Sequence, residues 1–267
     1  TIAGKNVGVA YRSTIYSVKI SMNPEGHAYC SDMARAVDIV IENMKKTGKN
    51  SVINLSYGMC RTVSLKLNQF MSLGGIANVA AGNDNTDSCS YGEYIDFDLD
   101  KGFIVGSTNR YDDISSFSNY GSCVEMYAPG SHILSLDSTS ETQCVYMSGT
   151  SMASPMVAGV VSAYWSEYSD LSNDIIISNI KLNSIKNKLN PKNKIINNNL
   201  ISLNLNFTLK KKRYYLIIAL IVFLIIICLF LYFCLKSLSK VKINPIKDIE
   251  RIEYLPSPVV RINDEGI

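Results

Sequence analysis

The sequence predicts an α/β fold in which a mostly parallel β-sheet carries helices on both faces, with one additional transmembrane helix near the C-terminus. Short, uniformly apolar runs, which are typical of buried parallel strands, alternate with segments of helical periodicity. One uninterrupted apolar run of 22 residues follows this alternating region. The 267 residues include 26 basic and 23 acidic side chains, and this near balance argues against a nucleic-acid-binding protein.

The alternating region contains an amphipathic helix, which is predicted over residues 31–46. Its apolar side chains share one face, Ser31 caps its start, and Gly48 follows its end. Apolar runs at 15–20 and 52–55 flank this helix, and they predict the strand, helix, strand order of a parallel unit. The same alternation continues, with helices predicted over 63–72 and 150–168 and strands over 76–81, 103–106, 124–128 and 145–147.

Composition divides the chain into four regions. Residues 1–170 have a net charge of −6 and form the predicted globular domain. Residues 171–213 have a net charge of +8 and are rich in Asn, Lys and Ile. We interpret them as the end of the domain and a weakly structured stalk, with one helix over 174–189. Residues 236–267 form a nearly neutral tail.

The run at 214–235 predicts a single transmembrane helix. It contains no charged side chain, and at about 1.5 Å per residue it reaches roughly 33 Å, enough to cross a hydrocarbon core of about 30 Å. A buried helix of a soluble domain is the alternative, but the run is too long and too uniformly apolar for one. Lys and Arg are equally frequent on its two sides, so flanking charge does not decide the orientation.

Ser151 is the first candidate catalytic residue. It lies in Met-Ser-Gly-Thr-Ser-Met-Ala-Ser-Pro, at residues 147–155, where a loop enters a helix predicted to be buried. The first N–H groups of a helix lack intrahelical partners, and the helix dipole favours negative charge there. Both properties suit a nucleophile that forms an oxyanion intermediate. The alternative is an ordinary helix-capping serine.

Asn83 is the second candidate. It follows an apolar strand in Ala-Ala-Gly-Asn-Asp, at residues 80–84, and parallel sheets place ligands at the carboxyl ends of their strands. Its amide could donate a hydrogen bond to an oxyanion, although such an Asn is often only a turn residue. A third segment, Val-Ile-Asn-Leu-Ser-Tyr-Gly at 52–58, also leads from a strand into a glycine-containing turn.

Taken together and in this order, these segments resemble the subtilisin-like serine proteases, or subtilases. The resemblance depends on three motifs, GTSMASP at residues 149–155, AAGND at 80–84 and SVINLSYG at 51–58. Residues 1–20 and 115–130 are also similar to the corresponding segments of the family. The proteinase K-like branch is the most similar. The resemblance is strong over residues 1–170 and weak over residues 171–200. It implies a three-layer subtilisin-like fold and a serine endopeptidase that acts on polypeptide substrates.

The resemblance also implies roles for individual residues. Ser151 would be the nucleophile, and Asn83 would donate to the oxyanion. One side of the substrate cleft would be formed by Ser56, Tyr57 and Gly58, whose backbone would form hydrogen bonds with an extended peptide. A wall of the pocket for the residue before the cleaved bond would be formed by Ala80, Ala81 and Gly82.

The chain departs from the family pattern in its catalytic base. Subtilases carry Asp, then His, then Ser, and Thr1 corresponds to a position just after the family's His. Neither His27 nor His132 matches that position. We therefore expect that an N-terminal part carrying Asp and His precedes this chain in a longer protease. The alternative is a catalytically inactive pseudoprotease that binds peptides or partners at the membrane.

Seven cysteines are present, and their spacing does not indicate a zinc site. Resemblance to proteinase K-like enzymes implies a disulfide between Cys89 and Cys123, with buried free thiols as the alternative. A disulfide would suit an extracellular or lumenal peptidase domain. With the span, this predicts a single-pass membrane protein whose residues 236–267 lie in the cytosol.

No cofactor is required for the implied chemistry, and no catalytic metal is expected. Subtilases often bind calcium as a structural ion, so acidic residues following Asn83 are candidate ligands. A solvated acidic loop is the alternative interpretation. The candidates are Asp84, Asp87, Glu93, Asp96, Asp98, Asp100 and Glu125.

Overall fold

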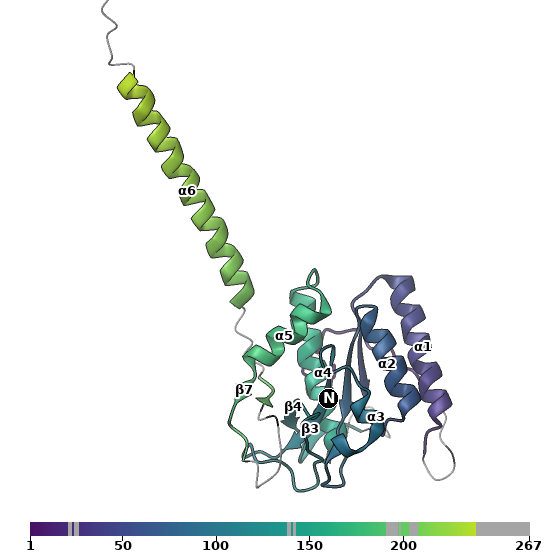
Figure 1. Cartoon of the computed structure of the whole chain (residues 1–267). Helices are drawn as coiled ribbons and strands as arrows, with labels where there is room; N and C mark the ends of the chain where they lie inside the picture. Colours follow the sequence, from purple (N-terminus) through teal and green to yellow (C-terminus); the bar gives the residue numbers. More distant parts are fainter. Residues whose placement is uncertain are drawn as a thin grey trace, which may run out of the picture. The chain divides into compact units, whose positions relative to one another are not determined.

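The computed structural model describes residues 1–20, 23, 27–137, 140, 143–190, 197, 199–202 and the backbone of 208–238. Contacts divide the chain into two compact units, Thr1–Asn206 and Phe207–Ile267. The first unit contains the sheet and the candidate site, and the second contains one long helix (Figure 1).

A six-stranded sheet forms the centre of the first unit, in the order β1-β2-β3-β4-β8-β7. Neighbours from β1 to β8 run parallel, and only β7 is antiparallel. This confirms the predicted mostly parallel sheet. The strands are β1 (Val52–Leu55), β2 (Ile76–Ala80), β3 (Gly102–Thr108), β4 (Met126–Pro129), β7 (Ile185–Lys186) and β8 (Asn199–Leu200).

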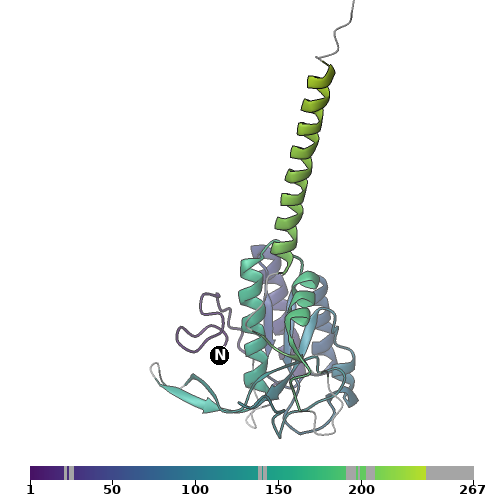
Figure 2. The ribbon, with the colours of Figure 1, turned by 90° about the vertical axis from the view of Figure 1, so that its left-hand side faces the viewer.

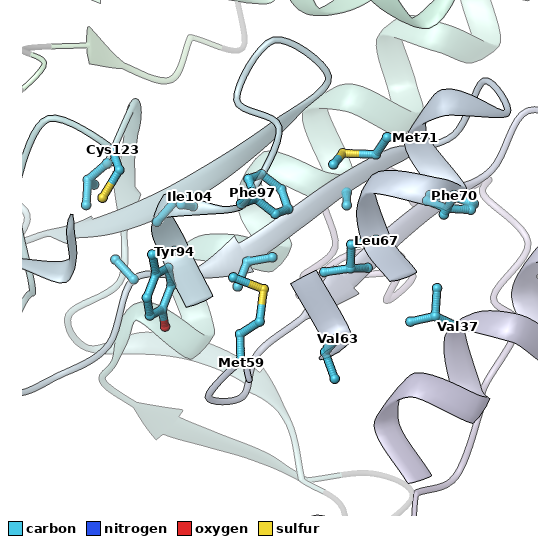
Figure 3. Packing of buried hydrophobic residues seen from close by; sticks show 14 of the residues in the cluster. Val37, Met59, Val63, Leu67, Phe70, Met71, Tyr94, Phe97, Ile104 and Cys123 are labelled. Carbon is cyan, nitrogen blue, oxygen red and sulfur yellow. The ribbon is translucent and has the colours of Figure 1, made fainter. Parts of the chain in front are cut away.

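Helices cover both faces of this sheet because the strands are apolar on both sides. Ala77 and Val79 of β2 join the core beneath α1 (Cys30–Thr47) and α2 (Arg61–Ser72). Ile76 instead joins the core beneath α4 (Thr150–Glu167) and α5 (Asn173–Asn183). Figure 3 shows the first of these cores, where Leu67 and Phe70 of α2 lie between the sheet and Val37 of α1.

Short elements complete the connection between β2 and β3. The 3₁₀-helix η1 (Ser88–Ser90) and the single turn α3 (Gly92–Ile95) follow the Asn83 segment. The hydroxyl of Tyr94 in α3 donates to the Ala80 carbonyl at 3.1 Å, which ties this connection to the carboxyl end of β2.

Two predicted strands differ from the structure. Residues 15–20 have no strand, and Ile15 and Tyr16 are exposed there. Residues 145–147 do form a strand, β6 (Cys144–Met147), but it pairs antiparallel with β5 (Ile133–Leu136) in a separate two-stranded sheet. Because β6 is exposed along its length, its apolar run does not mark a buried parallel strand. Figure 2 shows this pair extending away from the helices.

The structured part of the first unit extends beyond residue 170. Helix α5 buries Ile176, Ile177 and Ile180 against the sheet, and it ends at Asn183 rather than at residue 189. Strands β7 and β8 then add to the sheet beside β4. Part of the predicted stalk is therefore integral to the globular unit, and residues 191–196, 198 and 203–207 lie outside the described part of the chain.

The predicted span at 214–235 falls within α6 (Thr208–Leu238), which makes up the described part of the second unit. Among the residues described, no helix combines the length and the apolar character needed to cross a membrane, and the structure does not support the span. The predicted tail, from residue 239 onward, lies outside the described residues.

Candidate active site

Ser151 is the second residue of α4, directly after the loop that follows β6. Its side chain is half-buried, and its hydroxyl donates to the Ser56 carbonyl at 3.2 Å. In return, the Ser56 hydroxyl donates to the Ser151 carbonyl at 2.9 Å. The end of β1 and the first turn of α4 are therefore joined at the candidate nucleophile.

Asn83 lies beside the same helix start, with its side-chain orientation set by Thr150. Its Oδ1 accepts hydrogen bonds from the Thr150 backbone N–H at 2.8 Å and from the Thr150 hydroxyl at 3.0 Å. Because a backbone N–H can only donate, the atom facing it must be the amide oxygen. The Thr150 hydroxyl also accepts from the Gly82 N–H at 3.1 Å, so its own proton is directed toward Asn83.

This orientation leaves the Asn83 amide nitrogen beside the first turn of α4. A Cβ atom placed at Gly149 would lie 3.5 Å from Asn83 Nδ2 and 3.6 Å from the Ser151 nitrogen. Within the described part of the chain, neither donor has a hydrogen-bond acceptor. The two N–H groups therefore border one small space that glycine leaves open, an arrangement suited to a developing oxyanion.

A network of hydrogen-bonded polar side chains connects the start of α4, which carries Ser151, to β1. Asn54 accepts from the Ser154 hydroxyl at 2.8 Å and donates to the Ser56 hydroxyl at 2.9 Å. Since Ser56 contacts Ser151 directly, Asn54 links the first and second turns of α4 to β1. Neither Asn54 nor Thr150 was predicted from the sequence as part of the site. For Asn54, its position as a polar residue inside the apolar run 52–55 was an available indication.

The two predicted substrate-binding segments converge on this helix start. Ser56 contacts Ser151, while Tyr57 accepts a hydrogen bond from the Ala28 N–H at 3.0 Å, and a Cβ at Gly58 would meet no atom within 4 Å. The Gly58 position thus has open space beside it.

The second predicted segment is fixed through its backbone. The Ala81 carbonyl accepts from the Ser88 hydroxyl at 2.8 Å and from the Asn119 amide at 3.0 Å. Gly82 has φ +104, and a Cβ there would lie 2.4 Å from Asn119 Nδ2, so this position requires glycine. These contacts hold the backbone from Ala80 to Gly82 in one conformation.

Neither histidine reaches the candidate nucleophile. The imidazole of His132 stacks on Tyr146 with ring centres 4.4 Å apart, and its backbone N–H donates to the Ser148 hydroxyl at 2.8 Å. His27 is exposed in the loop before α1. Over the described residues, the hydroxyl of Ser151 has the Ser56 carbonyl as its partner and no imidazole.

Two disulfides occur in the first unit. The structure joins Cys89 to Cys123, the pair implied by the resemblance, and it also joins Cys30 to Cys60, which sequence analysis did not pair. Cys144 is an exposed free thiol. The Cys30–Cys60 bridge lies next to the Ser56–Gly58 segment and so ties it to the start of α1.

Three of the acidic residues considered for calcium form ion pairs with basic side chains of the chain. Asp96 pairs with Arg61 at 2.7 Å, Asp98 with Lys101 at 3.3 Å, and Glu125 with Lys181 at 2.8 Å. Asp87 instead accepts from the Cys89 N–H at 2.8 Å and begins η1. Among side chains that the structure describes, which exclude that of Glu93, no group of three or more acidic, His or Cys residues could hold a metal ion.

Residues 1–199 match the sequence profile described as the Subtilase family. The chain is 39% identical over 173 residues to the subtilisin-like serine protease Pen ch 18 of Penicillium rubens, which covers 61% of this chain and 34% of that protein. It is 37% identical over 177 residues to the subtilase-type proteinase psp3 of Schizosaccharomyces pombe, covering 65% of this chain and 38% of that one.

A solved structure is also similar. The crystal structure of a cold adapted subtilisin-like serine proteinase superposes with a TM-score of 0.67 at 32% identity, and the match covers 74% of this chain and 70% of that one. The chain spans about a third of the length of the curated relatives it matches.

Proposed function

Because this chain belongs to the subtilase family, we propose that it carries the nucleophile and the oxyanion site of a serine endopeptidase. In this proposal Ser151 Oγ attacks the carbonyl carbon of a peptide bond. The Asn83 amide and the Ser151 backbone N–H donate to the oxygen that becomes negatively charged. The supporting observation is the fixed orientation of Asn83, whose oxygen is held by two donors of Thr150.

The proposed reaction needs a base beside Ser151 Oγ. The proton leaves the hydroxyl as the new C–O bond forms, and an imidazole would accept it and later deliver it to the departing amine. Water would then release the acyl group from Ser151. Since His27 and His132 lie elsewhere, the proposal assigns this base to another segment of the protease.

The substrate would bind as an extended strand between the two convergent segments. Backbone groups of Ser56 to Gly58 would pair with the peptide, and Ala81 and Gly82 would border the side chain that precedes the cleaved bond. The hydrogen bonds from Ser88 and Asn119 support a preformed wall on that side.

A fluorophosphonate probe tests the proposal on the complete protein that contains this chain. We expect the probe to label the wild type, Ser151→Ala to abolish labelling, and Ser122→Ala, which changes an exposed serine elsewhere, to leave labelling unchanged. Absence of labelling in a folded wild type would reject the enzyme and leave the pseudoprotease, which would bind peptides at the same segments without cleaving them.

We also propose that the peptidase unit lies outside the cytoplasm and is anchored by residues 214–235. The two disulfides of the first unit support an oxidising compartment. The anchor is supported by the 22 uncharged residues of that run. Resistance to carbonate extraction, lost when 214–235 are deleted, tests the anchor; extraction of the intact protein would reject it.

A further inference from the structure

Asn78 lies in the middle of β2, between β1 and β3, and its side chain is fully buried. Neither its amide oxygen nor its amide nitrogen has a hydrogen-bond partner among the residues that the structure describes. Asparagine is disfavoured inside strands, and a buried amide without partners costs free energy because its hydrogen bonds with water are lost on folding. An apolar residue would therefore be more stable at this position unless the amide has a partner.

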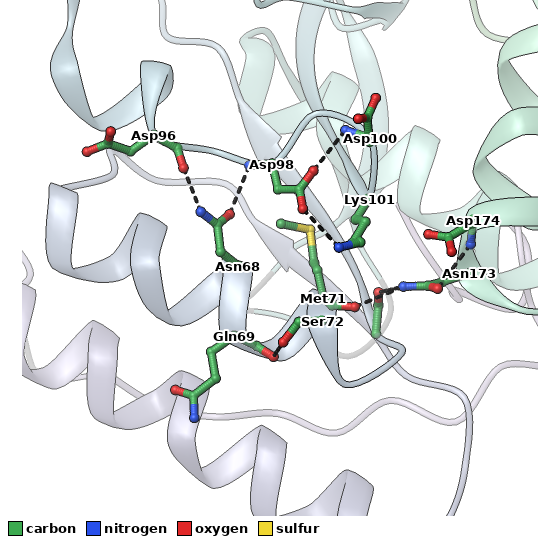
Figure 4. Close-up of polar contacts among 11 residues, drawn as sticks. Asn68, Gln69, Met71, Ser72, Asp96, Asp98, Asp100, Lys101, Asn173 and Asp174 are labelled. Atoms are coloured by element: carbon green, nitrogen blue, oxygen red, sulfur yellow. Dashed lines mark hydrogen bonds and ion pairs between the residues drawn. The ribbon is translucent and has the colours of Figure 1, made fainter.

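Other buried asparagines of the first unit have partners for both side-chain atoms. The Asn173 amide nitrogen donates to the carbonyls of Met71 and Gly75, both at 3.0 Å (Figure 4). The Asn173 oxygen accepts from the Asp174 N–H, also at 3.0 Å. Asn119 likewise donates through its nitrogen and accepts through its oxygen. Among the asparagines that the structure describes as buried, the one in β2 is the exception.

A second asparagine lies beside Asn78 on the same face of the sheet. Ile76 belongs to the core beneath α4, and side chains two positions apart in a strand share a face, so Asn78 also points toward α4. Asn54 is its register partner on the neighbouring parallel strand β1. Asn54 points the same way, because it accepts from the Ser154 hydroxyl of α4 at 2.8 Å. Since neighbouring strands are about 4.7–4.9 Å apart, the two amides lie side by side.

Asn54 can take a further hydrogen-bond partner. An amide side chain has two N–H donors and two acceptor positions on its oxygen. Asn54 uses one acceptor position for the Ser154 hydroxyl and one donor for the Ser56 hydroxyl. A small molecule that both donates and accepts can therefore bond to Asn54 and Asn78 together. The next side chain of β2 on this face is that of Ala80, and its small size favours room for a partner as small as water.

We propose that Asn78 and Asn54 hold a buried water molecule between their amides, and that Asn78 is thereby a positioning residue for Ser151. Buried waters typically make about three hydrogen bonds to polar groups that otherwise lack partners. Asn54 donates to the Ser56 hydroxyl, and the Ser56 carbonyl accepts from the Ser151 hydroxyl at 3.2 Å. The water thus fixes the orientation of the amide that supports the nucleophile. The effect on Ser151 rests on the proposed peptidase function, whereas the water site does not.

The variants Asn78→Thr and Asn78→Val test the water site in the complete protein that contains this chain. The two introduced side chains have the same shape and differ in one hydroxyl, which a buried water would satisfy and a dry core would leave without a partner. We expect the threonine variant to unfold at a higher urea concentration than the valine variant, and the wild type to be the most stable of the three. If the valine variant is more stable than both, the Asn78 amide lies in a dry core and the proposal is wrong.

A crystal structure of the complete wild-type protein tests the water directly. We expect one ordered water within about 2.7–3.2 Å of an amide atom of Asn78 and of an amide atom of Asn54. The water should be lost from the structure of Asn78→Val. Two amides in direct contact, or with no water between them, would overturn the proposal.

Fluorophosphonate labelling tests the effect on the nucleophile. Asn78→Val should slow labelling several-fold, and Asn78→Thr should recover much of the rate because its hydroxyl can hold the water. Ser64→Ala is the matched control and should label like the wild type. Ser64 is also fully buried, and its hydroxyl has no partner among the described residues, but it belongs to α2 on the other face of the sheet.

The labelling results separate the two parts of the proposal from the proposed function. Equal labelling rates for Asn78→Val and the wild type would reject the positioning role. A folded wild type that is not labelled would reject the peptidase, and the urea and crystallographic results would still decide whether the water site exists.

Discussion

The hydroxyl and the backbone N–H of Thr150 both donate to Asn83 Oδ1, at 3.0 and 2.8 Å. The residue before the candidate nucleophile therefore determines which way the Asn83 amide points. Asn83 itself is exposed, and both hydrogen bonds that the structure shows for its side chain come from Thr150. Thr150 is a positioning residue in this arrangement, and it acts through Asn83.

Thr150→Val should impair the oxyanion site while keeping the side-chain shape. The valine cannot donate to Asn83, so the amide is held by one hydrogen bond instead of two. Loss of an entire oxyanion donor in a subtilisin costs roughly 10²–10³ in turnover, and loss of its orientation should cost less, about tenfold. Fluorophosphonate labelling rates of the complete protease measure this effect. Thr150→Ser keeps the hydroxyl and should label like the wild type; equal rates for valine and serine would contradict the role.

Asn54 and Ser154 should be energetically coupled. Their 2.8 Å hydrogen bond is part of the chain that connects β1 to α4 beneath Ser151. Asn54→Leu leaves the Ser154 hydroxyl without its acceptor, which typically costs about 1–3 kcal/mol for a buried group. A double-mutant cycle with Ser154→Ala, measured by urea unfolding, should give a coupling of roughly 0.5–3 kcal/mol. Additive effects of the two substitutions would show that the contact does not matter.

Gly102 at the start of β3 should not tolerate a side chain. A Cβ there would lie 2.7 Å from the Ala77 carbonyl oxygen, and a backbone atom of the neighbouring strand cannot move aside cheaply. Gly102→Ala should therefore lower the free energy of unfolding by about 1–3 kcal/mol. Gly58→Ala is the matched control, because no atom lies within 4 Å of its added Cβ. Equal stability of the two variants would show that the strands adjust.

Sequence patterns predicted the helices and strands correctly where the apolar periodicity of a segment agrees with its burial in the structure. The helices α1, α2 and α4 and the strands β1 to β4 were predicted from apolar patterns. In the structure, apolar residues of β2, β3 and β4 are buried and β1 is partly buried in a two-sided sheet. The prediction for β6 placed it in the wrong sheet because an apolar run does not reveal that its side chains are exposed. Helix α5 was predicted as a longer helix, over 174–189, in a region interpreted as the end of the domain and a stalk. The sequence did not show that Ile176, Ile177 and Ile180 are buried.

The contacts within the site were less accessible to sequence analysis. Ser151 and Asn83 were found from their motifs, but the Asn83–Thr150 contact joins residues 67 positions apart. The Cys30–Cys60 pairing depends on a Cα separation of 6.3 Å, which only the fold supplies. Both the Asn83–Thr150 contact and the Cys30–Cys60 disulfide join residues that are far apart in the sequence, and local sequence patterns do not show which of these residues meet.

The two disulfides should contribute similar stability but differ in local effect. They join residues 30 and 34 positions apart, and loops of such similar length are expected to give comparable stabilisation, about 2–4 kcal/mol each. Cys60→Ser should in addition speed hydrogen exchange of residues 27–30 and 56–60, since the bridge and the Ala28–Tyr57 hydrogen bond hold these segments together. Cys89→Ser should leave that exchange unchanged. Faster exchange in both variants would argue against a local role.

Glu125 should make the stability of the folded chain depend on pH. Burial is the main cause that raises its pKa in the folded state, against the opposing ion pair with Lys181. The folded chain therefore binds this proton more tightly than the unfolded chain, in which a Glu titrates near about pH 4.3. The contribution of Glu125 to stability is fully present below that pH and is lost as pH rises through the folded pKa. Relative to Glu125→Gln, the wild type should lose stability as pH rises above about 4.3 and through the raised pKa of Glu125, as measured by urea unfolding. Lys181→Met removes the opposing ion pair and should steepen this dependence; a wild type that gains stability over the same range would show that the ion pair outweighs burial.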